Sequence, residues 1–284
     1  MTDAARADTA AGTVQYLDEG SGSPVLFIHG SPGGCDQGSL MTAFLRSRGH
    51  RTIALSRPGY LDTPLTDDNK TPRAQAALAI GLMDTLGIDR FGLMCWSGGG
   101  PSAYTLAATA PDRVSALVAI AALSMSYEFA SVGEEKMLMG RFGAWLMKEM
   151  ARHAPKSTIK SLVKEEGDLS KDDREDLVEK IWEDPTKRRW ALDFMGTVTG
   201  SRKPGFENDI DQFGKLKLDL DVVRAQTLLV HARTDSDVPY EQSEHAASKL
   251  PAAEFLTLGE GTHVSAWTAP DASDIQARIA HHLA

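Results

Sequence analysis

The chain has 284 residues, of which 42% are hydrophobic, and this is enough to bury a large core in one α/β domain with an insertion. Its formal net charge of −9 argues against nucleic acid or an anionic membrane surface as a partner. Cys35 and Cys95 are too few for a disulfide framework, which fits a reducing compartment.

Strand and helix signals alternate through the first part of the chain. Apolar stretches predict strands over residues 13–17, 25–29, 51–55, 91–95 and 114–122, and amphipathic patterns predict helices over residues 40–45, 71–86 and 98–110. Thr71 and Pro72 have the residue types of an N-cap and first helical position. The alternation implies right-handed βαβ crossovers and a mostly parallel, doubly wound sheet.

The alternation stops between Ser124 and Gly205, where the pattern is helical without a strand signal. Strands and helices then resume in turn over residues 227–231, 240–250, 254–258 and 271–283. A helical insertion between two sheet strands predicts a cap above the strand ends, where open α/β sheets bind ligands. We expect a core formed by residues 1–123 and 206–284 and a cap formed by residues 124–205.

The most informative segment runs from Arg90 to Pro101. Ser97 ends an apolar, strand-like run and is followed at once by Gly98 and Gly99. This small-x-Ser-x-Gly pattern is typical of a nucleophile elbow, a tight strand-to-helix turn that exposes the serine hydroxyl. Cys95 stands at the first small position, where glycine is usual. An ordinary glycine-rich βα turn is the alternative interpretation. The choice between the two depends on whether the rest of the chain supplies the other catalytic groups.

A serine nucleophile needs a base, and the base needs a group that orients it. His263 is the candidate base because it lies in a Gly-rich loop after the predicted strand 254–258. The alternative is a solvated loop histidine. Asp235 and Asp237 compete for the orienting acid, and the other of the two is then a loop-stabilising acceptor. Weaker candidates for the acid follow the predicted cap: Asp209, Asp211, Asp219 and Asp221.

An oxyanion hole needs two backbone donors aimed at one point. We expect the first from the N–H of Gly98, directly after the nucleophile. The second is expected from the N–H of Ser31, in the loop His29–Gly34 that follows the predicted strand 25–29. A flexible glycine turn is the alternative interpretation of that loop. His29 itself is expected to hold the loop rather than to transfer protons.

With these pieces, the chain resembles the cap-bearing branch of the α/β-hydrolase superfamily from about Thr13 to Leu283. The resemblance rests on the segments 29–32, 56–59, 95–99, 232–239 and 261–263. It implies an α/β-hydrolase fold with Ser97 as nucleophile and His263 as base. It favours Asp235 as the acid, because its spacing from Val238 and Pro239 is the usual one. Two residues depart from the pattern, Cys95 and Ala232, each where glycine is usual.

The resemblance implies a cofactor-free serine hydrolase that cleaves a carboxylic ester of a small, largely apolar substrate through an acyl-enzyme. Alternatives on the same fold are a carbon–carbon bond hydrolase, a lactonase, a perhydrolase, a biosynthetic tailoring enzyme or a non-catalytic ligand-binding receptor. The sequence contains no evident metal-ligand cluster, dinucleotide fingerprint or phosphate loop, so neither a metal nor a cofactor is expected. Ser97 argues against haloalkane dehalogenases and soluble epoxide hydrolases, which use aspartate.

Two apolar helix faces stand out in the predicted cap. One combines Met139, Phe142, Leu146 and Met150, and the other combines Trp190, Phe194 and Val198. Such faces pack a cap onto a core, and some of their members can line a pocket for an apolar substrate.

The N-terminal residues 1–12 lack the apolar core of a signal peptide. No apolar run approaches the roughly 20 residues of a membrane span. We therefore expect a cytoplasmic protein that acts on a small molecule, without a nucleic-acid or membrane partner. A homo-oligomer is compatible with the sequence.

Overall fold

A computed structural model describes residues 3–129 and 140–284. Its centre is one eight-stranded sheet with the strand order β1-β2-β4-β3-β5-β6-β7-β8. The strands from β3 onward pair in parallel, whereas β1 and β2 are antiparallel at one edge. The strands are β1 (Ala5–Thr9), β2 (Gly12–Gly20), β3 (Ser23–Ile28), β4 (His50–Leu55), β5 (Phe91–Trp96), β6 (Val114–Ile120), β7 (Gln226–Ala232) and β8 (Ala253–Leu258).

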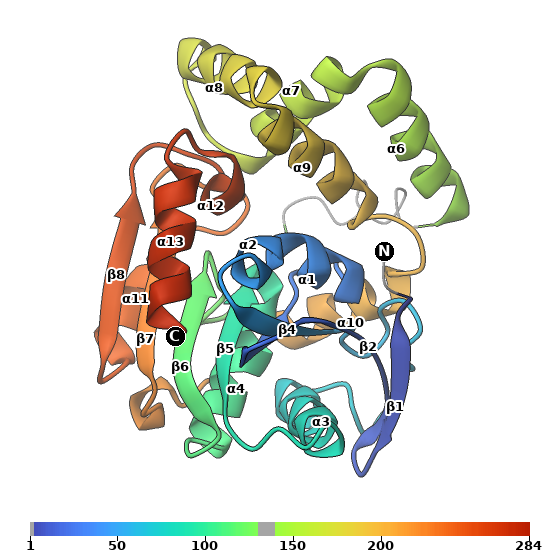
Figure 1. The fold of residues 1–284 in the computed structure, drawn as a ribbon, viewed down its shortest axis with the longest axis vertical. Helices are drawn as coiled ribbons and strands as arrows, with labels where there is room; N and C mark the ends of the chain where they lie inside the picture. Colours follow the sequence, from blue (N-terminus) through green and yellow to red (C-terminus); the bar gives the residue numbers. More distant parts are fainter. Residues whose placement is uncertain (1–2, 130–139) are drawn as a thin grey trace.

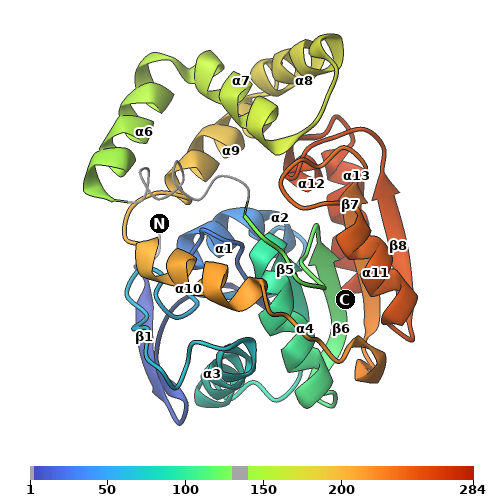
Figure 2. The same cartoon turned by 180° about the vertical axis from the view of Figure 1, so that it is seen from behind.

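Helices cover both faces of the sheet, which makes the fold doubly wound as predicted. The helices α1 (Cys35–Met41), α2 (Ala43–Arg46) and α13 (Ala272–His282) lie on the face seen in Figure 1. The opposite face, seen in Figure 2, carries α3 (Pro72–Thr85), α4 (Gly100–Thr109) and α11 (Glu241–Lys249). The short helix α12 (Ser265–Thr268) precedes α13.

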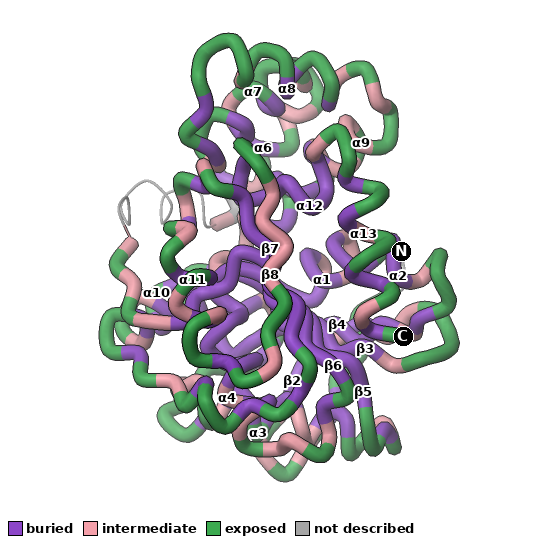
Figure 3. The backbone as a smooth tube through the Cα atoms, turned by 90° about the vertical axis from the view of Figure 1, so that its left-hand side faces the viewer, coloured by how far each residue is buried: buried purple, intermediate pink, exposed green. Residues whose placement is uncertain are grey.

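The strand sequences explain the two apolar layers. Successive side chains of a strand point to opposite faces, so Val25 and Phe27 of β3 join one core cluster while Leu26 and Ile28 join the other. All four are essentially inaccessible to solvent. Figure 3 shows the central strands as a buried centre, whereas the edge strand β8 is partly exposed.

Four helices between β6 and β7 lie above the carboxyl ends of the parallel strands (Figure 1). They are α6 (Arg141–His153), α7 (Pro155–Glu166), α8 (Lys171–Glu183) and α9 (Pro185–Gly196). The helix α10 (Lys203–Phe213) and a short 3-10 turn, η2 (Leu220–Val222), then lead back to β7.

The second predicted helix face packs as expected, because Phe194 is buried in the core cluster and Trp190 and Val198 pack against it. The first prediction is wrong for Phe142, which is 70% exposed, but Met150 packs against the core cluster as expected, and Met147 is buried in that cluster as well. The inward face is therefore turned relative to the predicted one. Met139 lies outside the described residues.

The edge strand β1 was not predicted, whereas the predicted strand 13–17 lies within β2. In β1 only Ala7 is buried, so this edge strand lacks the apolar alternation that marks a strand in sequence. Helix α3 begins as predicted, since the Thr71 side chain accepts a hydrogen bond from the N–H of Ala74 and Pro72 is the first helical residue. No described helix is long and apolar enough to cross a membrane.

Candidate active site

Ser97 occupies a sharp turn between β5 and α4. Its φ of 53° lies in the left-handed region, and the 3-10 turn η1 (Ser97–Gly99) leads directly into the helix. A Cβ atom on Gly99 would lie 2.4 Å from the carbonyl oxygen of Ile28 in β3, so only glycine lets helix and strand approach so closely. Cys95 is fully buried beneath the turn, where its small side chain fits the core. This is the geometry of the predicted elbow.

The Ser31 loop lies against the start of the elbow helix. A Cβ atom on Gly98 would lie 2.7 Å from the Cβ atom of Ser31, so the two segments are in contact. The same atom would lie 3.0 Å from the ring of Phe213 in α10. The two predicted backbone donors therefore come from neighbouring segments beside Ser97.

The Gly30–Ser31 peptide is fixed from one side. Nε2 of His29 accepts a hydrogen bond from the N–H of Arg57 at 2.8 Å, which leaves Nδ1 to donate to the carbonyl oxygen of Gly30 at 2.7 Å. The Arg57 guanidinium donates to the same oxygen at 2.9 Å. Because the C=O and N–H of a trans peptide point in opposite directions, the N–H of Ser31 faces away from Arg57.

A buried ion pair holds this arrangement. Asp209 of α10 accepts two hydrogen bonds from Arg57, each 2.7 Å long, and both side chains are only 1% exposed. The hydroxyl of Ser31 donates to Asp209 at 2.5 Å, and the hydroxyl of Tyr60 also donates to it. Burial lowers the pKa of Arg57, but Asp209 outweighs this effect and raises it. Asp209 is therefore paired with Arg57 and does not contact His263.

Asp235 follows β7 and accepts four hydrogen bonds. Its Oδ2 atom accepts from Nδ1 of His263 at 2.6 Å and lies 3.0 Å from Nε2 of His231. Its Oδ1 atom accepts from the N–H groups of Asp237 and Val238, both at 2.9 Å. Burial raises the pKa of Asp235, but His263 and His231 outweigh this effect and lower it to about 2. A permanently charged carboxylate thus orients His263.

Asp237 differs from the loop-stabilising acceptor that the sequence predicts. The loop amides bind Asp235, while Oδ2 of Asp237 lies 3.3 Å from Nε2 of His263. No described residue makes a hydrogen bond with this Nε2 atom. Trp96, the neighbour of Ser97, contacts His263 through its ring, with centroids 4.6 Å apart, and donates from Nε1 to the His263 carbonyl oxygen at 3.2 Å.

Glu166, at the end of α7, brings a third carboxyl group to the same place. Its carbonyl oxygen accepts from the N–H of His263 at 2.7 Å, and its Oε2 atom is buried without a hydrogen-bond partner among the described residues. Burial, reinforced by Asp237, raises the pKa of Glu166 to about 8. Burial lowers the pKa of His263, but Asp235 and Asp237 outweigh it and raise the value to about 9.

The sequence analysis missed this acidic cluster. Glu166 ends a helix of the insertion, Asp237 lies after β7 and His263 lies after β8, so no spacing in the sequence connects them. The three side chains place one possible ligand atom each within 4.8 Å of one another. A metal-ligand arrangement therefore exists among the described residues, although none was expected from the sequence.

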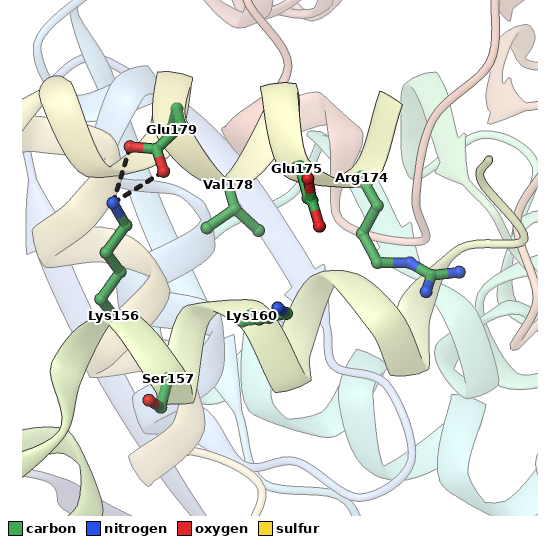
Figure 4. Close-up of a pocket in the computed structure, with 7 residues that line it drawn as sticks. All are labelled: Lys156, Ser157, Lys160, Arg174, Glu175, Val178 and Glu179. Carbon is green, nitrogen blue, oxygen red and sulfur yellow. Dashed lines mark hydrogen bonds and ion pairs between the residues drawn. The ribbon is translucent and has the colours of Figure 1, made fainter. Parts of the chain in front are cut away.

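A hollow lies away from this site, between α7 and α8. Figure 4 shows that it is lined mainly by charged side chains, with Lys156 paired to Glu179 at 2.7 Å. None of the candidate site residues lines it. This hollow is therefore separate from the candidate active site.

The family model for the alpha/beta hydrolase fold matches residues 23–270. The chain therefore belongs to the α/β-hydrolase family and is a hydrolase of that family.

Individual relatives cover nearly the whole chain. An alpha/beta hydrolase fold protein from Nakamurella multipartita is 43% identical, with a TM-score of 0.94 over 99% of both chains. A 2-hydroxymuconate semialdehyde hydrolase from Pseudomonas putida is 26% identical over 273 residues, which are 94% of this chain and 88% of the relative. A thermophilic esterase from Thermogutta terrifontis covers 100% of both chains at 19% identity and a TM-score of 0.67, and shares the fold.

Proposed function

We propose that this chain is a cofactor-free serine hydrolase that cleaves a carboxylic ester of a small, largely apolar substrate through an acyl-enzyme. The observation that carries the proposal is that the Ser97 turn and the Asp235–His263 pair, 2.6 Å apart, lie close together, since Trp96, the residue before Ser97, contacts the His263 ring. A serine in the left-handed region after a central strand presents its hydroxyl to the strand ends.

In the proposed mechanism, Ser97 attacks the ester carbonyl while His263 takes its proton through Nε2. Asp235 holds Nδ1 of His263 and stabilises the imidazolium. The N–H groups of Ser31 and Gly98 bind the oxyanion that develops on the carbonyl oxygen. The alcohol leaves with the proton from His263, and water then cleaves the acyl-enzyme.

Aromatic side chains beside the Ser31–Gly98 contact support an apolar substrate. The rings of Phe129 and Phe213 stack with centroids 5.9 Å apart, and Phe206 meets Phe129 edge to face at 5.0 Å. Phe206 and Phe213 are buried and Phe129 is partly exposed, and an apolar cluster of this kind beside the site suits an apolar acyl or alcohol group. We propose that the insertion of residues 124–205 acts as a cap over the site and that a small molecule is the partner.

The test is the Ser97→Ala variant on a series of activated aryl esters with increasing acyl length. We expect turnover to fall by roughly 10⁴ to 10⁶, as for the loss of a triad member elsewhere. Retention of more than a tenth of the wild-type rate would show that Ser97 is not the nucleophile. Cys95→Gly is the matched control, because it restores the usual elbow residue without removing a reacting group.

A carbon–carbon bond hydrolase is the second candidate. It is favoured by the 2-hydroxymuconate semialdehyde hydrolase of Pseudomonas putida, which aligns over 94% of this chain. The two candidates separate in one experiment, in which aryl esters and a β-diketone-type acid are offered to the same preparation. Faster cleavage of the carbon–carbon bond at equal concentration contradicts the ester proposal.

A further inference from the structure

Three side chains converge on the Nε2 side of His263. We propose that Glu166, Asp237 and His263 bind a divalent first-row metal ion such as Zn²⁺, and that the bound ion inhibits the hydrolase by occupying Nε2 of His263. The binding site stands on its own geometry. The inhibition rests on the proposed function, in which Nε2 must be free to take a proton.

The spacing of the ligand atoms fits such an ion. With metal–ligand distances near 2.1 Å, two ligands of a tetrahedral zinc lie about 3.4 Å apart. Nε2 of His263 and Oδ2 of Asp237 are separated by 3.3 Å. One carboxylate oxygen of Glu166 completes a group of three atoms that lie within 4.8 Å of one another. A carboxylate oxygen of Glu166 has to move toward the other two atoms for all three to bind one ion.

The backbone holds the three ligands in place without a metal. The carbonyl oxygen of Glu166 accepts from the N–H of His263 at 2.7 Å. The next residue, Gly167, pairs with Asp235 in an isolated antiparallel bridge, two residues before Asp237. The N–H of Asp168 donates to the carbonyl oxygen of Thr234 at 2.7 Å. The ligands thus come from segments that are already joined, which lowers the entropy lost on binding.

The polar atoms at the centre lack the partners that buried groups normally have. The His263 side chain is fully buried, and its Nε2 atom has no hydrogen-bond partner among the described residues. The Oε2 atom of Glu166 is also buried and has no hydrogen-bond partner among the described residues. A buried polar atom without a partner costs free energy, and such an atom in a native structure calls for an unseen ion or water. The ligand atom of Asp237, whose side chain is 39% exposed, lies within 4.8 Å of both other ligand atoms, so a cation there could contact all three groups.

The donor set selects the kind of ion. One imidazole nitrogen and two carboxylate oxygens suit zinc, cobalt or manganese, whereas calcium and magnesium prefer six or more oxygen ligands. Asp235 then orients His263 from its other nitrogen, as a carboxylate commonly does for a metal-bound histidine. Two charged carboxylates would neutralise the charge of a divalent ion.

Binding is tested by calorimetric titration of zinc into the Ser97→Ala variant, which separates binding from catalysis. We expect saturable binding of one ion, with cobalt also bound and magnesium not. Asp237→Asn and Glu166→Gln should each weaken zinc binding by more than the roughly 10- to 100-fold that loss of an outer-shell partner costs. Glu165→Gln is the matched control, because it removes the same charge one residue away and should leave the affinity within about twofold.

Inhibition is tested on the otherwise wild-type enzyme with an aryl ester, and each variant is compared with its own metal-free rate. Zinc should inhibit reversibly, with recovery after chelation, and the zinc concentration for half inhibition should rise in Asp237→Asn in step with the calorimetric constant. Absence of calorimetric binding at millimolar zinc, or equal affinity in the Asp237→Asn/Glu166→Gln double variant, overturns the site. Binding without inhibition overturns the regulatory part. Zinc binding by a protein that cleaves no ester contradicts the proposed function and leaves the site standing.

Discussion

The candidate site has two sides that differ in how their charged groups are paired: the oxyanion side around Ser31 and Asp209, and the base side around His263. On the oxyanion side, Asp209 is matched by the guanidinium of Arg57 and accepts hydrogen bonds from Arg57, Ser31 and Tyr60, although Nε of Arg57 has no partner among the described residues. On the base side, three carboxyl groups, those of Asp235, Asp237 and Glu166, surround one imidazole, so the acidic groups outnumber the basic one. A matched buried pair fixes a geometry, whereas an unmatched cluster shifts pKa values and attracts protons or cations. We therefore expect the oxyanion side to keep a fixed geometry and the base side to respond to pH and to cations.

The largest expected effect distinguishes two aspartates of the base side. Asp235→Asn should lower turnover by roughly 10⁴, because an amide donor at Nδ1 of His263 favours the wrong tautomer. Asp237→Asn should lose far less, since Asp237 makes no hydrogen bond to His263 Nε2. Steady-state rates with one aryl ester decide this. A greater loss in Asp237→Asn would assign the orienting role to that residue.

The next effect tests the matched pair. Asp209→Asn leaves the fully buried Arg57 charge without its partner, which costs about 3–5 kcal/mol of unfolding free energy. It also loosens the Gly30–Ser31 peptide, so kcat should fall more than KM changes. Urea unfolding and steady-state kinetics measure the two consequences. Asp211→Asn on the same helix, where the carboxylate pairs with Lys215 at the surface, should change neither.

The pH profile tests the unmatched side. Since Asp235 and Asp237 raise the pKa of His263 to about 9, kcat/KM should rise with pH into the alkaline range rather than level off near neutrality. Removing one negative charge in Asp237→Asn should shift the midpoint to lower pH. A wild-type midpoint near the ordinary histidine value of 6.5, unchanged by this substitution, would contradict the electrostatic account.

The smallest effect concerns stability. Glu166 keeps its proton in the folded state up to about pH 8, whereas in the unfolded chain it loses it near 4.5. Between these two pH values the unfolded state therefore binds fewer protons than the folded state. The contribution of Glu166 to the free energy of unfolding thus falls as pH rises. Glu166→Gln should remove this decline. Melting temperatures of both proteins at about pH 5 and about pH 8 provide the comparison, and parallel curves would count against a protonated Glu166.

The site residues that could be proposed from the sequence are those that a local pattern marks. Ser97 is recognisable because small neighbours and a preceding apolar strand are needed wherever a chain turns so tightly. Asp235 and His263 are recognisable because each follows a late strand of the sheet. The parallel strands themselves were predictable from apolar runs buried on both faces. The polar edge strand β1 carries no such signal, and it was missed.

The parts that could not be predicted depend on contacts between distant segments. The buried pair of Asp209 and Arg57 joins residues 152 positions apart, and Asp209 was considered only as a rival acid. Glu166 lies in the predicted helical insertion, far from His263 in the sequence, yet its carbonyl oxygen accepts a hydrogen bond from the N–H of His263. Phe142 lay on an apolar pattern but faces solvent, because packing against the core selects Met147 instead. Tertiary contacts override periodicity at these positions.

The central claim is that Ser97 is the nucleophile of a hydrolase, and covalent labelling tests it most directly. A serine-reactive aryl phosphonate is incubated with wild-type protein and with Ser97→Ala, and the adduct is located by peptide mass mapping. The account predicts one adduct per chain, on Ser97, and none in the variant. An adduct on another serine, or equal labelling of the variant, would contradict it.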